Sequence, residues 1–362
     1  MFNQTILNSN WHEYIILFFS ICLCLVFVML RSWILDLINR PSDLIAIQSM
    51  HTRQTPRLGG IAIFGAIGLG VIFSSVSTSG DYADFFLVTS LLFFVGLAED
   101  LGFQISPRHR LLAAVSSSLL IILVLGFCLP RTGIPIIDIV IDHWAVGIPL
   151  TVLVTVGISN GFNLIDGVNG LASLTGIVAA LALSQIAEVS GFTAMVHLSI
   201  LMAAGILGFF IINYPFGLIF LGDAGAYIIG FVLSWFGIAI LINIPDVSPW
   251  AILLTLFWPV ADTLIAIYRR SRRRLNIFSP DRLHVHQIVL RGLEICFFGQ
   301  NRRHITNPLT TLVMSPLIVT PSVVGVMLWD QNLNAFLAAI FFFVILFVSY
   351  IYAPHLIKRF RR

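Results

Sequence analysis

Long apolar runs recur along almost the whole of this 362-residue chain, and they constrain its fold more than any other feature. Only 10% of the residues are charged, against about 25% in an ordinary soluble protein. In a bilayer, every backbone polar group must be hydrogen-bonded inside the spanning segment, so each crossing takes about 20 predominantly apolar residues in a helix. The runs are far too long for strands. The sequence therefore predicts an all-α, polytopic transmembrane helical bundle.

Polar breaks divide the chain into about eleven predicted spans. The first has no basic segment before it and is followed by Arg31, so it is interpreted as a retained anchor and not as a signal peptide. Residues 1–362 are predicted to form a single transmembrane domain, with one large basic loop at 269–307. The predicted spans lie near residues 14–31, 58–75, 82–98, 110–129, 144–160, 171–187, 193–212, 223–243, 249–268, 308–328 and 334–353.

The distribution of basic residues predicts the orientation. Lys and Arg gather in the cytoplasmic loops of membrane proteins. If the N-terminus lies outside and the spans alternate, 19 of the 20 basic residues fall on the cytoplasmic side and only Arg131 lies outside. One miscounted span would scatter this pattern. It therefore supports the number of spans, a cytoplasmic C-terminus and a cytoplasmic loop at 269–307.

Two acidic motifs lie at predicted helix ends on the cytoplasmic side. Glu99-Asp100 ends the third span, and two adjacent carboxylates suit a divalent cation or a base near phosphate. The alternative is a solvated helix end. Asp223 opens the eighth span after Gly222, where a glycine leaves room for a phosphate–magnesium complex. An acid at this position could also be a helix N-cap and nothing more.

A third motif is rich in amides. Asn160, Asn163, Asp166 and Asn169 recur every three residues in N-G-F-N-L-I-D-G-V-N-G-L-A, residues 160–172. At this spacing they can line one side of a short helical or turn segment, where they could bind a nucleotide or a metal-bound water. An asparagine-rich turn with a helix cap is the alternative. Three amides and an acid at the membrane edge favour binding.

The fourth motif is S-P-D-R-L-H-V-H-Q, residues 279–287, in the large basic loop. His284 and His286 are separated by one residue, so both face the same way on an extended segment. Together with Arg282 they could clamp a pyrophosphate. The alternative is a pair of solvated histidines. A zinc site is not expected, since no further imidazole or thiolate ligand is near.

Two other features leave alternatives open. Asp262 lies about two turns inside the ninth span, where an acid is either functional or a structural partner for an arginine, and the second interpretation is favoured. Residues Gln287 to Phe298 could form an amphipathic helix on the membrane surface or a plain connecting helix.

The combination of motifs predicts one kind of chemistry. Hard oxygen ligands favour Mg²⁺, with Mn²⁺ as an alternative. Arginines and histidines favour phosphates, and an apolar bundle favours a lipid co-substrate. The residues alone therefore predict magnesium-dependent phosphoryl chemistry at the membrane surface.

The order of these motifs resembles that of the polyprenyl-phosphate N-acetylhexosamine-1-phosphate transferase superfamily. The likeness covers the helix number, the orientation and five motifs, namely R-L-G-G at 57–60, then 99–100, 160–172, 222–223 and the histidine loop. It implies that the phosphate of a polyprenyl (undecaprenyl) phosphate attacks the β-phosphorus of a UDP-N-acetylhexosamine and releases UMP. It also implies a bacterial plasma-membrane enzyme with a cytoplasmic active site and no nucleic-acid partner; a homodimer is left open.

The resemblance implies roles for individual residues. The candidate metal ligands are Asp223, Asp166 and Asp100. The candidate catalytic residues are Asp100, Asp223, His284 and His286, with the two histidines acting on the diphosphate. The candidate substrate-binding residues are Asn160, Asn163, Asp166, Asn169, Arg282 and Arg57.

Three positions depart from the family pattern. Glu99 and Asn169 stand where aspartate is usual, and Gln287 stands where a further histidine is common, so no catalytic role is assigned to Glu99 or Gln287. The 279–287 loop is similar to that of the branch that begins O-antigen, capsule or teichoic acid assembly. N-acetylglucosamine-1-phosphate is therefore expected to be the transferred group, and phospho-MurNAc-pentapeptide is the alternative.

Two rival functions make different predictions. An ion-coupled transporter would carry charges near the bilayer midplane and paired broken helices in repeated halves. A CDP-alcohol phosphotransferase would share the D-G-V-N-G-L-A pattern, but it needs further aspartates along the following helix, and residues 173–187 contain none.

Overall fold

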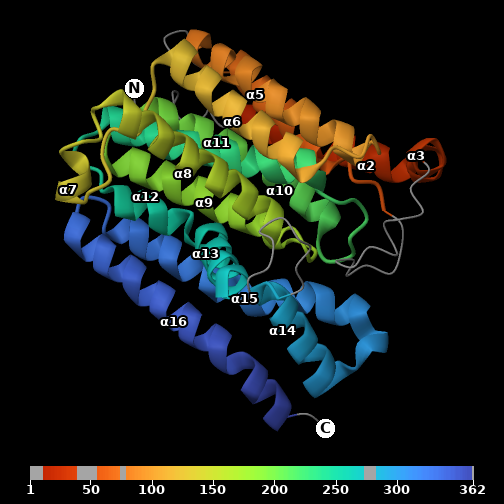
Figure 1. Ribbon diagram of the computed structural model, residues 1–362. Helices are drawn as coiled ribbons and strands as arrows, with labels where there is room; N and C mark the ends of the chain where they lie inside the picture. Colours follow the sequence, from red (N-terminus) through yellow and green to blue (C-terminus); the bar gives the residue numbers. More distant parts are fainter. Residues whose placement is uncertain (1–10, 39–54, 74–78, 273–282, 361–362) are drawn as a thin grey trace, which may run out of the picture.

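The computed structural model describes residues 11–38, 55–73, 79–272 and 283–360, and all regular structure in these ranges is helical (Figure 1). The first helices are α2 (Trp11–Met29), α3 (Arg31–Ile38), α4 (Gly59–Phe73), α5 (Ser79–Asp100), α6 (Pro107–Leu125), α7 (Pro135–Asp138) and α8 (Trp144–Ile165). The next are α9 (Leu171–Val189), α10 (Thr193–Asn213), α11 (Gly222–Asn243), α12 (Pro249–Thr255), α13 (Phe257–Arg272) and α14 (Val285–Leu293). The π-helix η2 (Glu294–Phe298), the 3₁₀-helix η3 (Gln300–Arg302), α15 (Arg303–Met327) and α16 (Asn332–Arg359) follow.

Nine helices in the described ranges are long and apolar enough to cross a membrane. They are α2, α5, α6, α8, α9, α10, α11, α15 with the turn before it, and α16. The pair α12–α13 is a tenth candidate, although its two axes differ by 86°. α4 has only 15 residues, which span about 22 Å, whereas the hydrocarbon core is about 30 Å thick. The all-α membrane bundle is confirmed, but the prediction of eleven full spans exceeds what these helices support.

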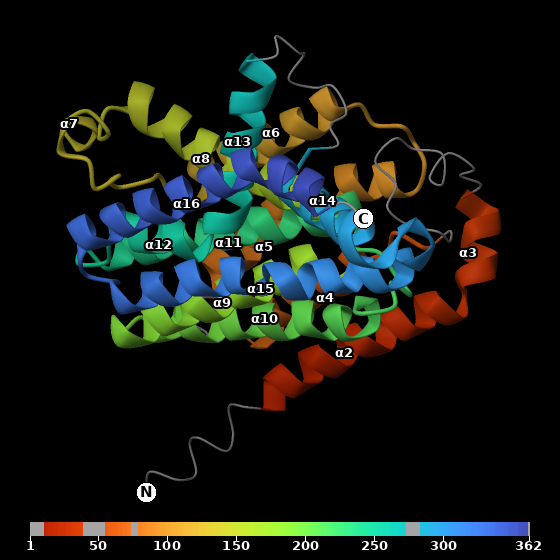
Figure 2. The same ribbon diagram turned by 90° about the horizontal axis from the view of Figure 1, so that it is seen from below.

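α11 lies at the centre of the bundle. Every residue from Gly222 to Leu241 is buried, and α4, α5, α8 and α9 pack around the helix (Figures 1 and 2). A helix that is apolar on all sides is expected where protein surrounds it. The outer helices α2 and α16 instead expose many large apolar side chains, as suits helices that face lipid. The N-terminus of α11 is thereby fixed by its neighbours.

The break between α12 and α13 has a local cause. Pro259 has no N–H, so it cannot donate to the carbonyl of Thr255, which is the bond that would continue the helix. The hydroxyl of Ser322 on α15 donates to that carbonyl instead, at 3.3 Å. It is the one bent pair in the described part of the chain. A single broken span gives no support to a transporter built from two repeated halves.

The segment at 287–298 packs on the protein. α14 contacts α15 and α16, and its Leu290 is fully buried. At the start of η2, the carboxylate of Glu294 accepts a hydrogen bond from the guanidinium of Arg303 at 2.7 Å, which connects η2 to the start of α15. Of the two interpretations of this segment, the structure favours a connecting helix.

Candidate active site

Asp100 caps the N-terminus of α11 from a neighbouring helix. Its Oδ1 accepts a hydrogen bond from the N–H of Asp223 and its Oδ2 from the N–H of Ala224, both at 2.9 Å. The first amides of a helix lack partners within the helix, and a carboxylate satisfies them well. Gly222, with φ +77°, permits this contact, because a Cβ there would lie 2.5 Å from Asp100 Oδ2. This capping role was not predicted from the sequence; the catalytic and metal roles of Asp100 stay predictions.

The segment 57–60 lies beside this cap. Two of its backbone N–H groups donate to the carbonyls of residues 220–221, each at 2.9 Å. These bonds place the guanidinium of Arg57 3.9 Å from the carboxylate of Asp100 and 3.8 Å from that of Asp223. The predicted motif at the entry to the second span and the predicted acid of the eighth span therefore meet in one site.

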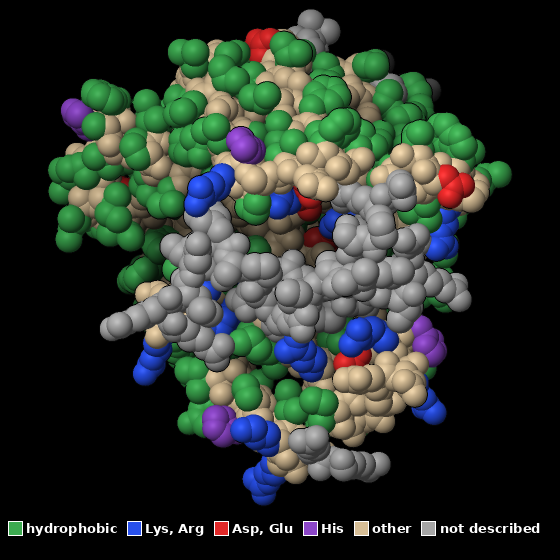
Figure 3. Space-filling view, turned by 45° about the vertical axis from the view of Figure 1, so that its right-hand side comes forward, with side chains coloured by type: hydrophobic (Ala, Val, Ile, Leu, Met, Phe, Trp, Pro, Cys, Tyr) green, Lys and Arg blue, Asp and Glu red, His purple; other side chains and the backbone are tan. Residues whose placement is uncertain are grey.

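Side chains from two further helices reach Asp223. The amide of Asn163, near the end of α8, donates to Asp223 Oδ1 at 3.1 Å. Arg110 of α6 forms an ion pair with the same carboxylate. α6 begins after the N-cap Ser106, which puts Arg110 in its first turns. Figure 3 shows acidic side chains in a hollow beside Lys and Arg side chains.

Arg110 is a site residue that sequence reasoning missed. It served only as a marker of orientation, because no motif singles it out. The available signal was an arginine at the start of an apolar helix, on the same predicted side as the acidic motifs. A charged side chain at the end of a membrane helix is costly to desolvate, so an arginine there is expected to face an anion.

Asp166 lies in the turn between α8 and α9. Its carboxylate makes no hydrogen bond to any other described residue. Burial raises the pKa of Asp166 to about 7, and the charge of Arg57 partly opposes this effect. A partly buried carboxylate without a hydrogen-bond partner is a group that a cation would satisfy. Asn160, by contrast, donates to the carbonyl of Val156 in its own helix at 3.0 Å, so the structure does not bring it to Asp223.

Asn169 is engaged by the protein on three sides. Its N–H donates to Asn307 Oδ1 at 2.8 Å, and its carbonyl accepts from the hydroxyl of Thr311 at 2.6 Å, both on α15. Its side-chain amide donates to the carbonyl of Pro215 at 2.9 Å. These bonds fasten the α8–α9 turn to α15 and to the loop before α11. Substrate binding by Asn169 stays a prediction, while its structural role is visible.

His284 and His286 lie side by side, but not because both belong to an extended segment. The backbone is extended only at His284, the N-cap residue of α14, and His286 already lies in the helix. Their rings are 5.8 Å apart and nearly parallel, at 14°. A Cβ on Gly167 would lie 2.3 Å from His286 Nε2, so the ring of His286 packs closely against Gly167, the residue after Asp166. The histidine motif and the amide-rich motif therefore meet; Arg282 lies outside the described residues.

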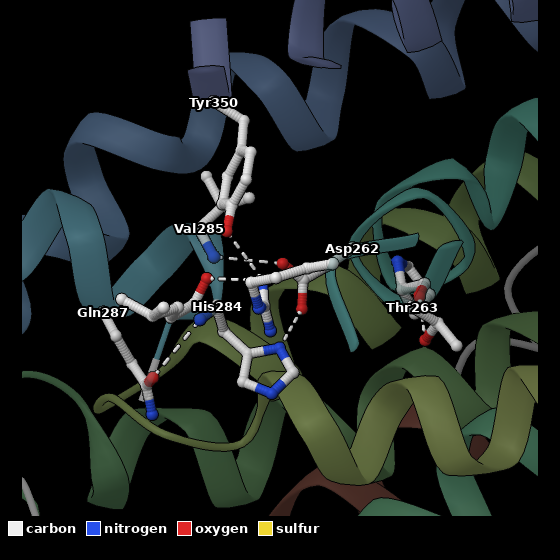
Figure 4. Close-up of polar contacts among 9 residues, drawn as sticks. Asp262, Thr263, His284, Val285, Gln287 and Tyr350 are labelled. Atoms are coloured by element: carbon white, nitrogen blue, oxygen red, sulfur yellow. Dashed lines mark hydrogen bonds and ion pairs between the residues drawn. The ribbon is translucent and has the colours of Figure 1, made fainter. Parts of the chain in front are cut away.

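The two histidine rings differ in their surroundings. His286 is fully buried, and neither of its ring nitrogens has a hydrogen-bond partner. Burial lowers its pKa to about 4, so the ring is neutral at pH 7. A neutral imidazole offers a diphosphate one N–H donor at most. His284 Nδ1 instead lies 2.6 Å from Asp262 Oδ2 (Figure 4).

The structure shows the surroundings of three residues whose roles the sequence left open. Asp262 has His284 as its hydrogen-bond partner and also interacts electrostatically with Arg270, so its interpretation as the structural partner of an arginine stays a prediction. Gln287 accepts a hydrogen bond from the N–H of His284 at 3.3 Å, which is a helix-capping contact. Glu99 lies in the last turn of α5, next to Asp100, and its role stays open.

The carboxylates suit magnesium, provided that the substrate completes the site. No three His, Cys, Asp or Glu residues gather as a metal-binding group within the described ranges. Mg²⁺ usually takes only one or two carboxylates and fills its shell with water and substrate phosphates. Asp223 and the unpartnered Asp166 supply the hard oxygen atoms that such a site needs. The residues present therefore fit the predicted cation.

Comparisons with known proteins cover the part of the chain that holds most of these residues. Residues 82–241 match the model of glycosyl transferase family 4, a range that holds Asp100, Arg110, the 160–172 motif and Asp223. A probable undecaprenyl-phosphate N-acetylglucosaminyl 1-phosphate transferase of Bacillus subtilis is 28% identical over 70% of this chain and 69% of its own. The undecaprenyl-phosphate alpha-N-acetylglucosaminyl 1-phosphate transferase of Escherichia coli K12 is 27% identical over 71% and 70%. A decaprenyl-phosphate N-acetylglucosaminephosphotransferase of Mycobacterium tuberculosis is 26% identical over 67% of each chain.

Proposed function

We propose that this chain is a member of glycosyl transferase family 4, whose model matches residues 82–241, and that it transfers a sugar-1-phosphate from a UDP-sugar to a polyprenyl phosphate. The names of the relatives favour N-acetylglucosamine-1-phosphate as the transferred group and an undecaprenyl or decaprenyl chain as the lipid. The product is a lipid diphosphate that carries the sugar. Phospho-MurNAc-pentapeptide remains the alternative group.

The main support for this proposal is that positively charged side chains surround the carboxylate of Asp223. The guanidinium groups of Arg57 and Arg110 lie next to this carboxylate, and the amide of Asn163 donates to it. Guanidinium groups bind phosphate oxygens in bidentate geometry, and carboxylates would hold a metal ion that neutralises phosphate charge. A site that offers both at the end of a membrane bundle suits a nucleotide diphosphate that meets a lipid phosphate.

The reaction forms one P–O bond and breaks another. An oxygen of the polyprenyl phosphate attacks the β-phosphorus of the UDP-sugar. The bond between that phosphorus and the bridging oxygen breaks, and UMP leaves with the oxygen. A phosphate monoester, with a second pKa of about 6, is already largely dianionic at pH 7, so no base is required. The main tasks of the protein are alignment and charge neutralisation.

The residues divide these tasks. Asp223 and Asp166 would hold Mg²⁺, which when bound neutralises charge on the diphosphate oxygens. Arg57 and Arg110 bind phosphate oxygens directly, and His284 contacts the diphosphate. Asp100 keeps the first turn of α11, and with it Asp223, in place.

The membrane setting of the enzyme is multi-pass, and we place its active site on the cytoplasmic face. The support for this side is the distribution of the basic residues, since 19 of 20 fall on the site side of the predicted topology. UDP-sugars are cytoplasmic metabolites, so the same side serves the proposed reaction. A bacterial plasma membrane is the proposed location.

The experiment is an exchange assay with Asp223→Asn. Wild-type membranes with polyprenyl phosphate and Mg²⁺ should incorporate labelled UMP into UDP-GlcNAc, and the variant should not. The matched control is Asp84→Asn, an exposed acid near the opposite end of α5, which should exchange like the wild type. Full activity of Asp223→Asn would remove Asp223 from the mechanism.

A panel of UDP-sugars sharpens the proposal. Wild-type protein is assayed for UMP release with UDP-GlcNAc, UDP-GalNAc, UDP-MurNAc-pentapeptide and UDP-glucose. UDP-GlcNAc is expected to give the highest kcat/KM. If no UDP-sugar released UMP in the presence of polyprenyl phosphate and Mg²⁺, the proposed function would be wrong.

A further inference from the structure

Asp262 has no place in the phosphate site described above, yet it contacts a residue of that site. It lies on α13 and is only 1% exposed. Its Oδ2 is 2.6 Å from His284 Nδ1, and its Oδ1 accepts a hydrogen bond from the N–H of Val285 at 3.0 Å (Figure 4). One carboxylate therefore holds both the ring of His284 and the first peptide of α14.

A second residue of α13 holds the same segment. Arg269 lies about two turns beyond Asp262, so both side chains leave the same face of the helix. Its guanidinium donates to the carbonyl of Leu283 at 2.9 Å and to the hydroxyl of Tyr350 on α16 at 2.8 Å. Residues 283–285 are thereby fixed to α13 at two points, so the imidazole of His284 has a fixed position relative to the bundle.

The contact with Asp262 also determines which nitrogen of His284 is available. An ionised carboxylate only accepts hydrogen bonds, so Nδ1 must carry the hydrogen. No described residue forms a hydrogen bond with Nε2. The ring of His286 stacks beside His284 and presses on Gly167, next to Asp166. Asp262 thus occupies Nδ1 and leaves Nε2 as the nitrogen of His284 that is available to a ligand.

Stability alone does not account for this pair. Burial of a carboxylate costs desolvation free energy, and two apolar side chains of similar volume often stabilise a fold as well or better. The same oxygen atoms, however, fix ring rotation and tautomer, which is what a histidine needs when its other nitrogen binds a ligand.

We propose that Asp262 is a positioning residue for the transfer reaction, which orients His284 so that its Nε2 contacts the substrate diphosphate. This inference rests on the proposed function, since it concerns the same reaction. Asp262 itself contacts no substrate and acts only through His284.

The test compares single and double variants of the purified full-length enzyme. Asp262→Asn keeps the volume and one oxygen, but its amide cannot replace both acceptor atoms. We expect kcat to fall about 10- to 100-fold, the range seen when a residue that orients a ligand-binding histidine is removed, with KM changed less than threefold. Asp262→Glu should recover part of the rate. In a His284→Gln background, adding Asp262→Asn should cost less than twofold, because the residue to be oriented is gone.

Controls separate positioning from a merely structural role. Asp138→Asn removes a carboxylate with three hydrogen bonds at the opposite end of α11, and should leave kcat unchanged. The thermal midpoint of each variant is measured in detergent. If Asp262→Asn lowered the rate of His284→Gln by the same factor as that of the wild type, or if its loss followed a fall in thermal midpoint, the positioning role would be wrong. A wild type without transfer activity would instead overturn the proposed function, and this inference with it.

Discussion

The two ends of the bundle use the same residue types in different ways. At the end remote from the site, Asp138 accepts hydrogen bonds from the N–H and the hydroxyl of Thr132 and from the N–H of Gly133, at 2.6, 2.7 and 3.0 Å. Beside it, Arg131 donates to three backbone carbonyls at 2.6 to 2.9 Å, those of Leu241, Ile244 and Val247. Their hydrogen bonds are made within the protein, and a structural role explains them.

At the site end, the same groups face one another across helices. Arg57 and Arg110 approach Asp223, while Asp166 and the ring nitrogens of His286 have no hydrogen-bond partner among the described residues. Buried polar groups are normally satisfied, so the exceptions are informative. The comparison teaches that titratable side chains with unsatisfied polar atoms, more than charge itself, indicate where a ligand binds.

Among the substitutions that compare the two ends of the bundle, replacement of Arg110 should reduce activity the most. Arg110→Gln removes a cation that faces Asp223 and, in the proposed reaction, a phosphate oxygen. We expect kcat/KM for the UDP-sugar to fall about 100-fold, as when one preorganised donor to a developing charge is lost. UMP release by purified enzyme measures this.

Arg108→Gln is the matched control for this change. Arg108 lies in the first turn of the same helix and is exposed. Its replacement is expected to change kcat/KM less than threefold. Equal losses in both variants would mean that the charge of this helix end matters and that the contact of Arg110 with Asp223 does not.

The sequence predicted the end of the bundle at which the site lies, because apolar length and polar breaks are local signals. Glu99-Asp100, the amide-rich motif and Asp223 each follow or precede a predicted span, and alternation of spans places them on one side. The meeting of the histidine motif with the amide-rich motif was predicted only through the family resemblance. The packing of His286 on Gly167 supports it.

The roles of single residues were harder to predict, because they depend on which helices are neighbours. Asp100 and the N–H of Asp223 are 123 residues apart in the sequence, and no local pattern pairs them. For Asp262 the favoured interpretation was an arginine partner near the same helix end, and no local pattern indicated that a histidine 22 residues later would form its hydrogen bond. The predicted span at 58–75 and α4 begin within one residue of each other, but the described helix has only 15 residues, fewer than a full crossing needs.

A smaller effect, on stability and not on catalysis, is expected at the other end. Arg131→Gln leaves carbonyls at the end of α11 without their donors, and each unsatisfied buried carbonyl costs about 1–3 kcal/mol. Water near the membrane surface offsets part of this cost. We expect the free energy of unfolding to fall by about 1–3 kcal/mol, seen as a lower thermal midpoint in detergent, with kcat at 25 °C unchanged. An unchanged midpoint with a reduced kcat would contradict the division between the two ends.

The smallest expected effect concerns the pH dependence of stability at Asp166. Its pKa is about 7 in the folded protein against the ordinary 3.8, so folding favours the protonated form. The fold therefore loses stability as pH rises from about 4 to about 7, the interval in which only the unfolded chain readily ionises. Asp166→Asn removes this titration, so the thermal midpoint without Mg²⁺ should exceed that of the wild type at pH 8 and differ less at pH 4.

Addition of Mg²⁺ at pH 8 tests whether the ionised carboxylate of Asp166, which lowers the stability of the fold, binds the metal ion. A cation bound by Asp166 stabilises the folded state of the wild type by mass action, and the variant lacks that ligand. The wild-type midpoint should rise with Mg²⁺ more than that of Asp166→Asn, which reduces or reverses the difference between them. Equal rises in both proteins would mean that the unpartnered carboxylate is no part of the metal site, and that Asp223 must hold the cation with other ligands.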